Sequence, residues 1–242
     1  MSGTLIMLRH GQSEANADGL FTGLLDAPLT DTGREEARHA AALLMDADLH
    51  PPVWLCSPLR RAAETSEIVR AQSCPGPAKV EMDWRLAERN YGALTGRSKA
   101  DVRTEYGEKQ YLAWRRSTHR TPPPMTEERF AALGRVPAWL GLTESLAAVI
   151  TRTGTIWRDR IEPVLHSGRD VLVIAHGNSL RALCTVVDRL SEEEVQRLNI
   201  PTGQPLVYRI GHDDRPVIRG GVYLDPAAAT LAAATIARQG GT

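Results

Sequence analysis

Two histidines in this sequence are each followed directly by a glycine, and both are suited to chemistry at phosphorus. One apolar run ends in Arg9-His10-Gly11, and another, far along the chain, ends in His176-Gly177. A neutral imidazole can act as a nucleophile, and the guanidinium of Arg9 matches the oxygens of a phosphoryl group. The first motif therefore suggests an enzyme that forms phosphohistidine.

The apolar runs before these histidines predict two strands of one sheet. Residues 170–175 are apolar almost throughout, as expected for a strand buried on both faces of a parallel sheet. Ligands of such sheets bind outside the carboxyl ends of the strands. We therefore expect His10 to lie unburied at the end of its strand, and His10 and His176 to face one space of the size of a phosphate group.

A third junction between a strand and a helix adds an arginine. Residues 53–56 predict a short strand, after which Ser57 is a suitable N-cap and Pro58 suits the first helical position. Arg60 would then lie in the first turn, where the helix dipole favours an anion. We expect Arg60 in the site, whereas Arg61 fits a solvated position on the helix surface.

These motifs resemble those of the histidine phosphatase superfamily, and within it the phosphoglycerate mutases that depend on 2,3-bisphosphoglycerate. Arg9-His10-Gly11, Arg60 and His176 carry the superfamily signature. Further segments typical of the mutases follow in the family's order up to about residue 225. They are residues 21–23, 86–94, 114–116, 142–146, 176–183 and 199–203.

The resemblance implies an α/β fold, a three-layer α/β/α arrangement with a mostly parallel central sheet. We expect a single domain over residues 1–225, with a largely helical insertion at about 83–140 that lies over the site. Inside the insertion, the pattern predicts two short helices near 98–106 and 108–116. The alanine-rich tail 226–242 is compatible with either a helix or a disordered segment.

The composition narrows the function classes. The chain of 242 residues carries 29 basic and 29 acidic side chains, so no global field attracts nucleic acid or an acidic membrane. Cys56, Cys74 and Cys184 show no metal-ligand spacing, and the first and last suit a reduced core. We see no signal peptide and no stretch of transmembrane length, and expect a cytoplasmic enzyme.

Phosphoryl transfer can be assembled from these residues. We expect neutral His10 to attack phosphorus through one ring nitrogen while the other donates to a backbone carbonyl. The transition state spreads charge over three oxygens, so fixed donors and cations supply most of the catalysis. No acidic cluster adjoins His10, and we predict no metal. We predict Arg9, Arg60 and His176 as the catalytic groups that hold the phosphoryl oxygens. Asn16 and the Gly177 N–H are the predicted neutral hydrogen-bond donors.

Glu88 is the predicted acid and base. A hydroxyl that gives or receives a phosphoryl group must gain or lose a proton, which a carboxylate can carry. Pattern alone fits a surface salt bridge better; the resemblance to the mutases implies the catalytic role. Phosphoglycerate carries about three negative charges, so the site needs further cations. The resemblance assigns substrate binding to Gly11, Ser13, Asn16, Thr22, Gly23, Arg89, Tyr91, Lys99, Arg115, Arg116, Gly177 and Asn178.

Three functions remain open. A mutase that interconverts 3- and 2-phosphoglycerate in glycolysis and gluconeogenesis, primed by 2,3-bisphosphoglycerate, is favoured. A phosphatase on small phosphorylated metabolites or proteins is the alternative, and a non-catalytic phosphate-binding module is the third. The family's pattern implies a possible homodimer or homotetramer, with small-molecule phosphoglycerates as partners. Ala15, where these mutases commonly carry tryptophan, and the short segment 125–141 leave the balance of mutase and phosphatase activity open.

Overall fold

A six-stranded sheet forms the centre of the computed structural model, which describes residues 3–73, 79–211 and 215–238. The strand order is β3-β2-β4-β1-β5-β6. The first four of these run parallel, whereas β5 is antiparallel to β1 and β6 to β5, which confirms the mostly parallel sheet. The strands are β1 (Thr4–Arg9), β2 (Val53–Cys56), β3 (Val80–Met82), β4 (Val171–Ala175), β5 (Leu206–Arg209) and β6 (Val222–Tyr223).

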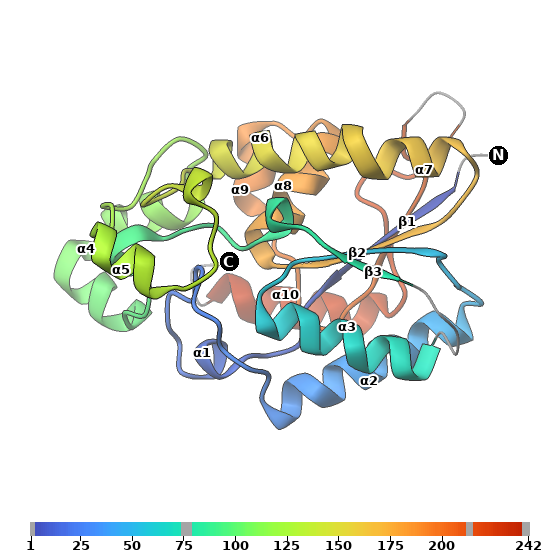
Figure 1. Ribbon diagram of the computed structural model, residues 1–242, viewed down its shortest axis with the longest axis horizontal. Helices are drawn as coiled ribbons and strands as arrows, with labels where there is room; N and C mark the ends of the chain where they lie inside the picture. Colours follow the sequence, from blue (N-terminus) through green and yellow to red (C-terminus); the bar gives the residue numbers. More distant parts are fainter. Residues whose placement is uncertain (1–2, 74–78, 212–214, 239–242) are drawn as a thin grey trace.

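Helices cover both faces of the sheet (Figure 1). On one face lie α2 (Asp31–Asp46), α3 (Arg60–Ser73) and α10 (Pro226–Arg238). On the other lie α6 (Leu146–Ile156), α7 (Glu162–His166), α8 (Gly177–Asp188) and α9 (Glu192–Arg197). The short α1 (Glu14–Ala17) follows β1, and the insertion contributes α4 (Lys99–Arg116) and α5 (Glu127–Ala132) at one end of the molecule.

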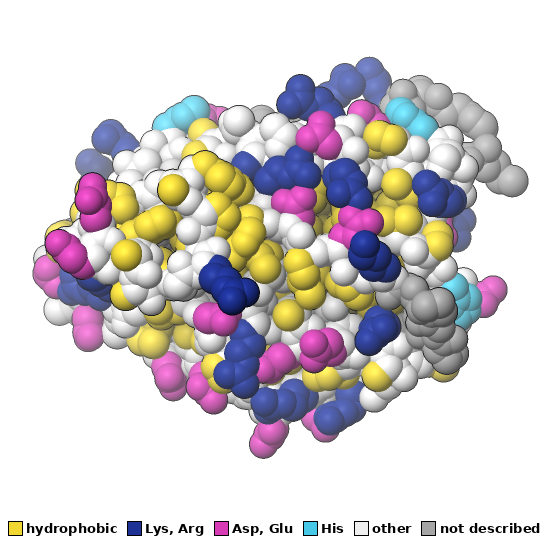
Figure 2. Space-filling view, viewed as in Figure 1, with side chains coloured by type: hydrophobic (Ala, Val, Ile, Leu, Met, Phe, Trp, Pro, Cys, Tyr) yellow, Lys and Arg dark blue, Asp and Glu magenta, His cyan; other side chains and the backbone are white. Residues whose placement is uncertain are grey.

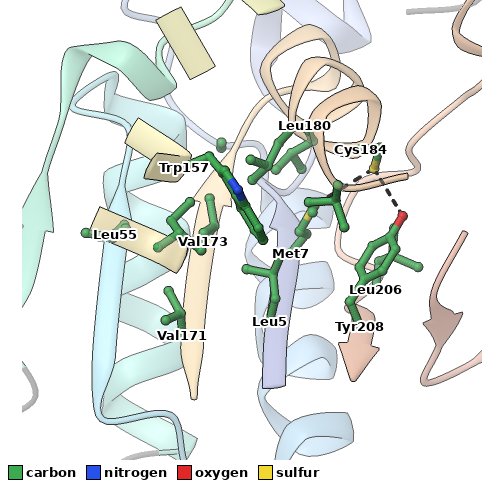
Figure 3. Close-up of a cluster of buried hydrophobic side chains, with 14 of the residues drawn as sticks. Leu5, Met7, Leu55, Trp157, Val171, Val173, Leu180, Cys184, Leu206 and Tyr208 are labelled. Atoms are coloured by element: carbon green, nitrogen blue, oxygen red, sulfur yellow. Dashed lines mark hydrogen bonds between the residues drawn. The ribbon is translucent and has the colours of Figure 1, made fainter. Parts of the chain in front are cut away.

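Two hydrophobic layers explain why the central strands are apolar throughout. Successive side chains of a strand point to opposite faces, so Leu5 and Val173 pack in the layer toward α8, which Figure 3 shows. Ile6 and Leu172 pack in the layer toward α2 and α3. Burial on both faces accounts for the continuous apolar run of β4. Both described cysteines are buried and free, as predicted, while Cys74 lies outside the described residues.

Helix α4 is two helical halves that meet at Gly107, as the sequence predicted. Gly107 has a φ of 77° and a ψ of 159°, a conformation that favours glycine. A straight helix would separate Lys99 from Arg115 by about 24 Å. Because the chain turns at Gly107, these two residues line the same pocket instead.

The alanine-rich tail forms helix α10, with residues 239–242 outside the described part. Ala229 is fully buried, and Asp225 at the start of the helix lies 4.0 Å from His39 of α2. The helix thereby reaches the mouth of the predicted site, where it walls an outer cavity. Among the described residues, no helix has the length and apolar character needed to cross a membrane.

Candidate active site

The two predicted imidazoles meet at the carboxyl ends of β1 and β4. Arg9 pairs with Ala175 in the parallel ladder, so the residues that follow leave the sheet side by side. The ring centroids of His10 and His176 are 4.9 Å apart, at an angle of 59°, which confirms that they converge. The expectation that His10 is unburied is wrong: His10 and His176 are only 2% and 0% exposed. The loops and helices that follow the strands cover this end of the sheet.

His10 is held as a neutral ring with one nitrogen ready to react. Its Nδ1 lies 2.7 Å from the carbonyl oxygen of Gly11, which can only accept a hydrogen bond, so Nδ1 carries the proton. The lone pair therefore resides on Nε2, to which Arg61 Nε donates at 3.2 Å. Burial, and then the charges of Arg61 and Arg9, hold the pKa of His10 well below its usual value.

The turn after His10 is fixed by close approach to α2 and α3. The Gly11 N–H donates to Thr65 Oγ1 at 3.1 Å, and the Gln12 N–H donates to Glu36 at 2.6 Å. A Cβ on Gly11 would lie 2.1 Å from the carbonyl oxygen of Gly33, so only glycine fits. These contacts set the direction in which the His10 ring leaves β1.

Arg61, and not Arg60, is the arginine at the histidines. Arg61 is 1% exposed and also donates to the carbonyl oxygens of Gly23 and Leu25. The Arg60 side chain is 54% exposed and pairs with Glu64 one turn along, at 2.5 Å. Helix α3 begins at Arg60, two residues later than the sequence suggested, and the Arg60 side chain lies on its exposed face. The predicted role of Arg60 is therefore corrected to Arg61.

The helical periodicity of the sequence indicates which of the two arginines is buried. The residues of α3 that face the interior repeat every three to four positions: Ala62, Thr65, Ser66 and Val69. Arg61 is four residues before Thr65 and shares its face, since the Thr65 hydroxyl donates to the Arg61 carbonyl. Helical periodicity therefore identifies the buried arginine better than position in the first turn does.

Two buried nitrogen atoms at this centre lack a partner in the part of the chain that the structure describes. They are Arg9 Nε and His176 Nδ1. The other nitrogen of His176, Nε2, lies 2.7 Å from Ser57 Oγ, and Arg9 also donates to the Ile200 carbonyl at 2.7 Å. Burial chiefly holds the pKa of His176 well below its usual value. Unsatisfied buried groups call for an explanation, and an anion with several oxygens would supply acceptors for both.

Most of the predicted binding residues line a narrow inner pocket of about 40 Å³, and an outer cavity of about 490 Å³ adjoins it. The two share Arg9, Asn16, Lys99 and Arg115, and α10 walls the outer one. Glu88 faces the inner pocket. The predicted residues that line the inner pocket are Arg9, Asn16, Thr22, Gly23, Glu88, Tyr91, Lys99, Arg115 and Asn178.

The inner pocket is rich in cations. Burial, followed by the charges of Arg115 and Arg9, lowers the pKa of Lys99 to about 7, and Glu88 opposes this effect. The guanidinium of Arg115 lies 5.6 Å from the Phe21 ring centroid, which fixes it against an aromatic face. A bound anion would relieve the repulsion among these cations.

Five of the predicted binding residues do not line the inner pocket: Gly11, Ser13, Arg89, Arg116 and Gly177. Arg89 is fully buried, and its guanidinium donates to the carbonyl oxygens of Trp114, Arg120 and Glu144, each at 2.8 Å. Arg116 donates to Asn199 Oδ1 at 2.9 Å. Ser13 caps α1 by accepting from the Asn16 N–H. Gly177 begins α8 directly after His176.

A wider groove of about 920 Å³ lies beside the segment that precedes Glu88. Trp139, Leu140 and Met82 are part of its lining, and Figure 2 shows hydrophobic side chains gathered on this face between α5 and α6. It contains none of the residues predicted for chemistry. Within residues 3–73, 79–211 and 215–238, no three His, Cys, Asp or Glu side chains are grouped so that they could hold a metal ion.

Comparison with known proteins agrees with this geometry. The family model described as the histidine phosphatase superfamily (branch 1) matches residues 5–220. The chain belongs to the histidine phosphatase superfamily. It is 46% identical over 249 residues to the 2,3-bisphosphoglycerate-dependent phosphoglycerate mutase of Rhodococcus jostii (strain RHA1), covering 99% of this chain and 98% of that protein. The mutase of Mycobacterium tuberculosis (strain ATCC 25177 / H37Ra) is 44% identical over 248 residues, covering 99% and 98%.

Solved histidine phosphatase structures share the fold. The mycobacterial glucosyl-3-phosphoglycerate phosphatase in complex with VO3 superposes with a TM-score of 0.71 at 25% identity, covering 91% of this chain and 100% of that chain. The product of an open reading frame of Mycobacterium tuberculosis gives a TM-score of 0.68 at 28% identity, covering 93% and 100%. The predicted α/β fold and the resemblance to the mutase branch are confirmed.

Proposed function

We propose that this histidine phosphatase interconverts 3-phosphoglycerate and 2-phosphoglycerate through a phosphohistidine on His10. The observation that carries the proposal is the second set of charges: Lys99 and Arg115 line one pocket with Glu88 and with Arg9, the residue that precedes His10. Phosphoryl transfer alone requires no such cations. A substrate with both a phosphate and a carboxylate requires them.

His10 is prepared for in-line attack by its hydrogen bonds. Its Nδ1 proton is held by the Gly11 carbonyl, which supports attack through Nε2. Arg61 Nε donates to the lone pair of His10 Nε2 at 3.2 Å. For attack, the guanidinium must therefore turn away from Nε2 and toward the oxygens of the incoming phosphoryl group. The same movement places positive charge where it develops in the transition state.

Glu88 is the group proposed to carry the proton of the substrate hydroxyl. Its carboxylate lines the inner pocket, and its Oε1 accepts from the Arg89 N–H at 2.7 Å. This hydrogen bond orients the carboxylate at the pocket. The carboxylate would take the proton as His10 gives up the phosphoryl group and return it in the reverse step.

The primer proposed for this site is 2,3-bisphosphoglycerate, and the residues present fit it. Buried Arg9 Nε and His176 Nδ1 suit the oxygens of one phosphate, while Lys99 and Arg115 suit a second anionic group. When bound, the bisphosphate supplies the phosphoryl group that primes His10. The proposal includes no metal, a cytoplasmic location, a single domain over residues 1–225 and an assembly of two or four identical subunits.

A phosphatase is the second candidate, because solved relatives of similar fold are named phosphatases. Turnover of 3-phosphoglycerate, coupled to consumption of 2-phosphoglycerate, separates the two when run with and without added 2,3-bisphosphoglycerate. A mutase isomerises only after priming. Phosphate release that needs no primer, with no isomerisation, would favour the phosphatase. A protein that does neither would be a binding module.

A further inference from the structure

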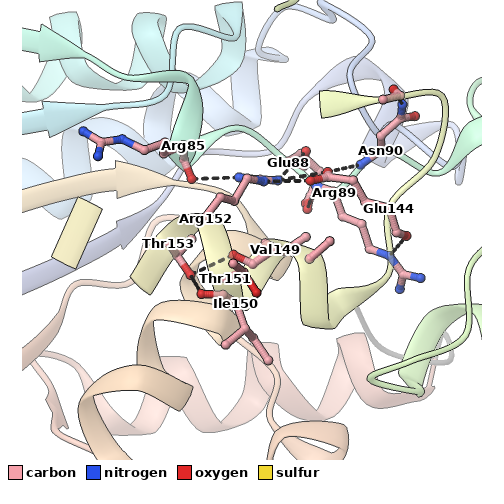
Figure 4. A network of polar contacts seen from close by, with 12 residues as sticks. Arg85, Glu88, Arg89, Asn90, Glu144, Val149, Ile150, Thr151, Arg152 and Thr153 are labelled. Atoms are coloured by element: carbon pink, nitrogen blue, oxygen red, sulfur yellow. Dashed lines mark hydrogen bonds and ion pairs between the residues drawn. The ribbon is translucent and has the colours of Figure 1, made fainter. Parts of the chain in front are cut away.

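A buried ion pair lies behind the loop that carries Glu88. Glu144 and Arg152 are 5% and 7% exposed, and they form a two-pronged contact with Nε–Oε1 and Nη2–Oε2 distances of 2.9 and 3.1 Å (Figure 4). Glu144 immediately precedes the cap of α6, and Arg152 lies inside that helix. Burying two charges is costly unless the geometry is well defined, so the contacts of this pair indicate what it organises.

Each member of the pair holds backbone groups of the Glu88 loop. Arg152 Nη1 donates to the Arg85 carbonyl at 2.7 Å, and its Nη2 donates to the Glu88 carbonyl at 3.2 Å. Glu144 accepts from the Asn90 N–H at 2.9 Å, and its own N–H donates to the Asn90 carbonyl at 2.9 Å. The pair therefore fixes the chain before, at and after Glu88.

One peptide unit links this pair to the carboxylate. The peptide between Glu88 and Arg89 has its carbonyl held by Arg152, while its N–H donates to Glu88 Oε1. Because a peptide unit is planar, fixing the carbonyl also fixes the direction of the N–H. Arg152 thus acts on the position of the Glu88 side chain without touching it.

We infer that the Glu144–Arg152 pair positions Glu88 for proton transfer. Neither side chain lines the inner pocket, so both are positioning residues. The inference rests on the proposed role of Glu88. His10 has separate supports, the Gly11 carbonyl and Arg61, so loosening the pair affects the proton step and leaves attack on phosphorus in place.

The test compares two phosphoryl donors in Arg152→Lys, which keeps the charge but loses the planar fork. The phosphoglycerate hydroxyl must exchange a proton during transfer. With a nitrophenyl phosphate, the phosphoryl group moves to His10 Nε2, the P–O bond breaks, and nitrophenolate leaves with its electron pair and needs no proton. We expect isomerisation to slow by about 10- to 100-fold, while the stoichiometric burst of nitrophenolate stays within about twofold.

Matched variants complete the design. Arg160→Lys changes an exposed arginine that pairs with Glu81, and both rates should match the wild type. Glu144→Gln loosens the pair from its other end and replaces Arg152→Lys should that variant not fold.

The outcomes separate the inference from the proposed function. Glu88→Gln should show the same split between donors, larger by about one to two decades. The positioning role is overturned if Glu88→Gln slows isomerisation more than the nitrophenolate burst, whereas Arg152→Lys slows both reactions equally or slows neither. If Glu88→Gln leaves isomerisation unchanged, the proposed role of Glu88 is overturned, and the inference with it.

Discussion

The two halves of the candidate site are built differently. One half follows directly from the sheet: His10, His176 and Arg61 all lie just beyond the ends of parallel strands. The other half comes from the insertion, where Glu88 and Lys99 are held by side-chain to backbone contacts and by the turn at Gly107. The sheet half presents buried neutral rings that suit attack on phosphorus. The insertion half presents charged side chains, and the pKa of Lys99 there depends on its burial and on the charges of its neighbours.

The largest effect is expected where the sheet half is broken at the nucleophile. His10→Ala removes the nitrogen proposed to attack phosphorus, so the phosphoenzyme and all isomerisation should be lost. A tryptic map of protein treated with labelled primer provides the measurement. Acid-labile label retained in this variant, with circular dichroism like that of the wild type, would refute the assignment.

Next in size is the difference between two adjacent arginines of α3. Arg61→Ala should lower kcat/KM by about 10²- to 10³-fold, because a preorganised donor to the transition state is lost. Arg60→Ala removes only an exposed pair with Glu64 and should stay within about twofold. Steady-state kinetics of both variants decide the matter. A loss in Arg60→Ala as large as in Arg61→Ala would restore the cap-based prediction.

The insertion half should make the affinity for substrate depend on pH. The free-enzyme pKa of Lys99 is lowered to about 7, and a bound anion favours the protonated form, which raises that pKa in the complex. The contribution of Lys99 to the affinity for 3-phosphoglycerate is therefore full well below pH 7 and weakens as the pH rises through 7, by at most about tenfold per unit.

Calorimetric Kd values between pH 6 and 9 measure this dependence. The wild type should lose affinity above pH 7, whereas Lys99→Arg should show a nearly constant Kd, because arginine stays charged. The same slope in both proteins would mean that another group titrates. A flat profile in the wild type would contradict the lowered pKa.

The smallest effects concern stability and separate the rigid turn of the sheet half from an ordinary helix. Gly11→Ala places a Cβ 2.1 Å from a backbone oxygen and should destabilise the fold by about 1–3 kcal/mol. Gly154→Ala in α6 meets only a methyl group at 3.8 Å and should stabilise it by about 0.5–1 kcal/mol. Urea unfolding gives both values. A neutral Gly11→Ala would show that the turn can move.

The two histidines of the sheet half could be predicted from the sequence because their signals are local, whereas Arg61 was missed. The apolar runs give β1 and β4, and each ends in His-Gly, so convergence of His10 and His176 follows from the rules of parallel sheets. Their burial could not be predicted, because it depends on contacts with residues distant in the sequence, such as Arg61 against His10 and Ser57 against His176.

The insertion half depended on resemblance, and there the predictions were less accurate. Arg89 belongs to the matching motif, yet its guanidinium donates to three carbonyls, because a buried cation must satisfy its donors where acceptors lie. Arg152 lies on an amphipathic helix, where the pattern predicts only a polar side chain. Its contacts with residues 85 and 88 arise from tertiary packing that no local signal encodes.

The most direct measurement of the central claim is a pulse and chase of one phosphoryl group. Protein labelled from 2,3-bisphosphoglycerate is isolated, the label is mapped, and unlabelled 3-phosphoglycerate is then added. We expect all label on His10 and its transfer to phosphoglycerates much faster than its release as inorganic phosphate. Label on another residue, or label that appears only as inorganic phosphate, would contradict the account.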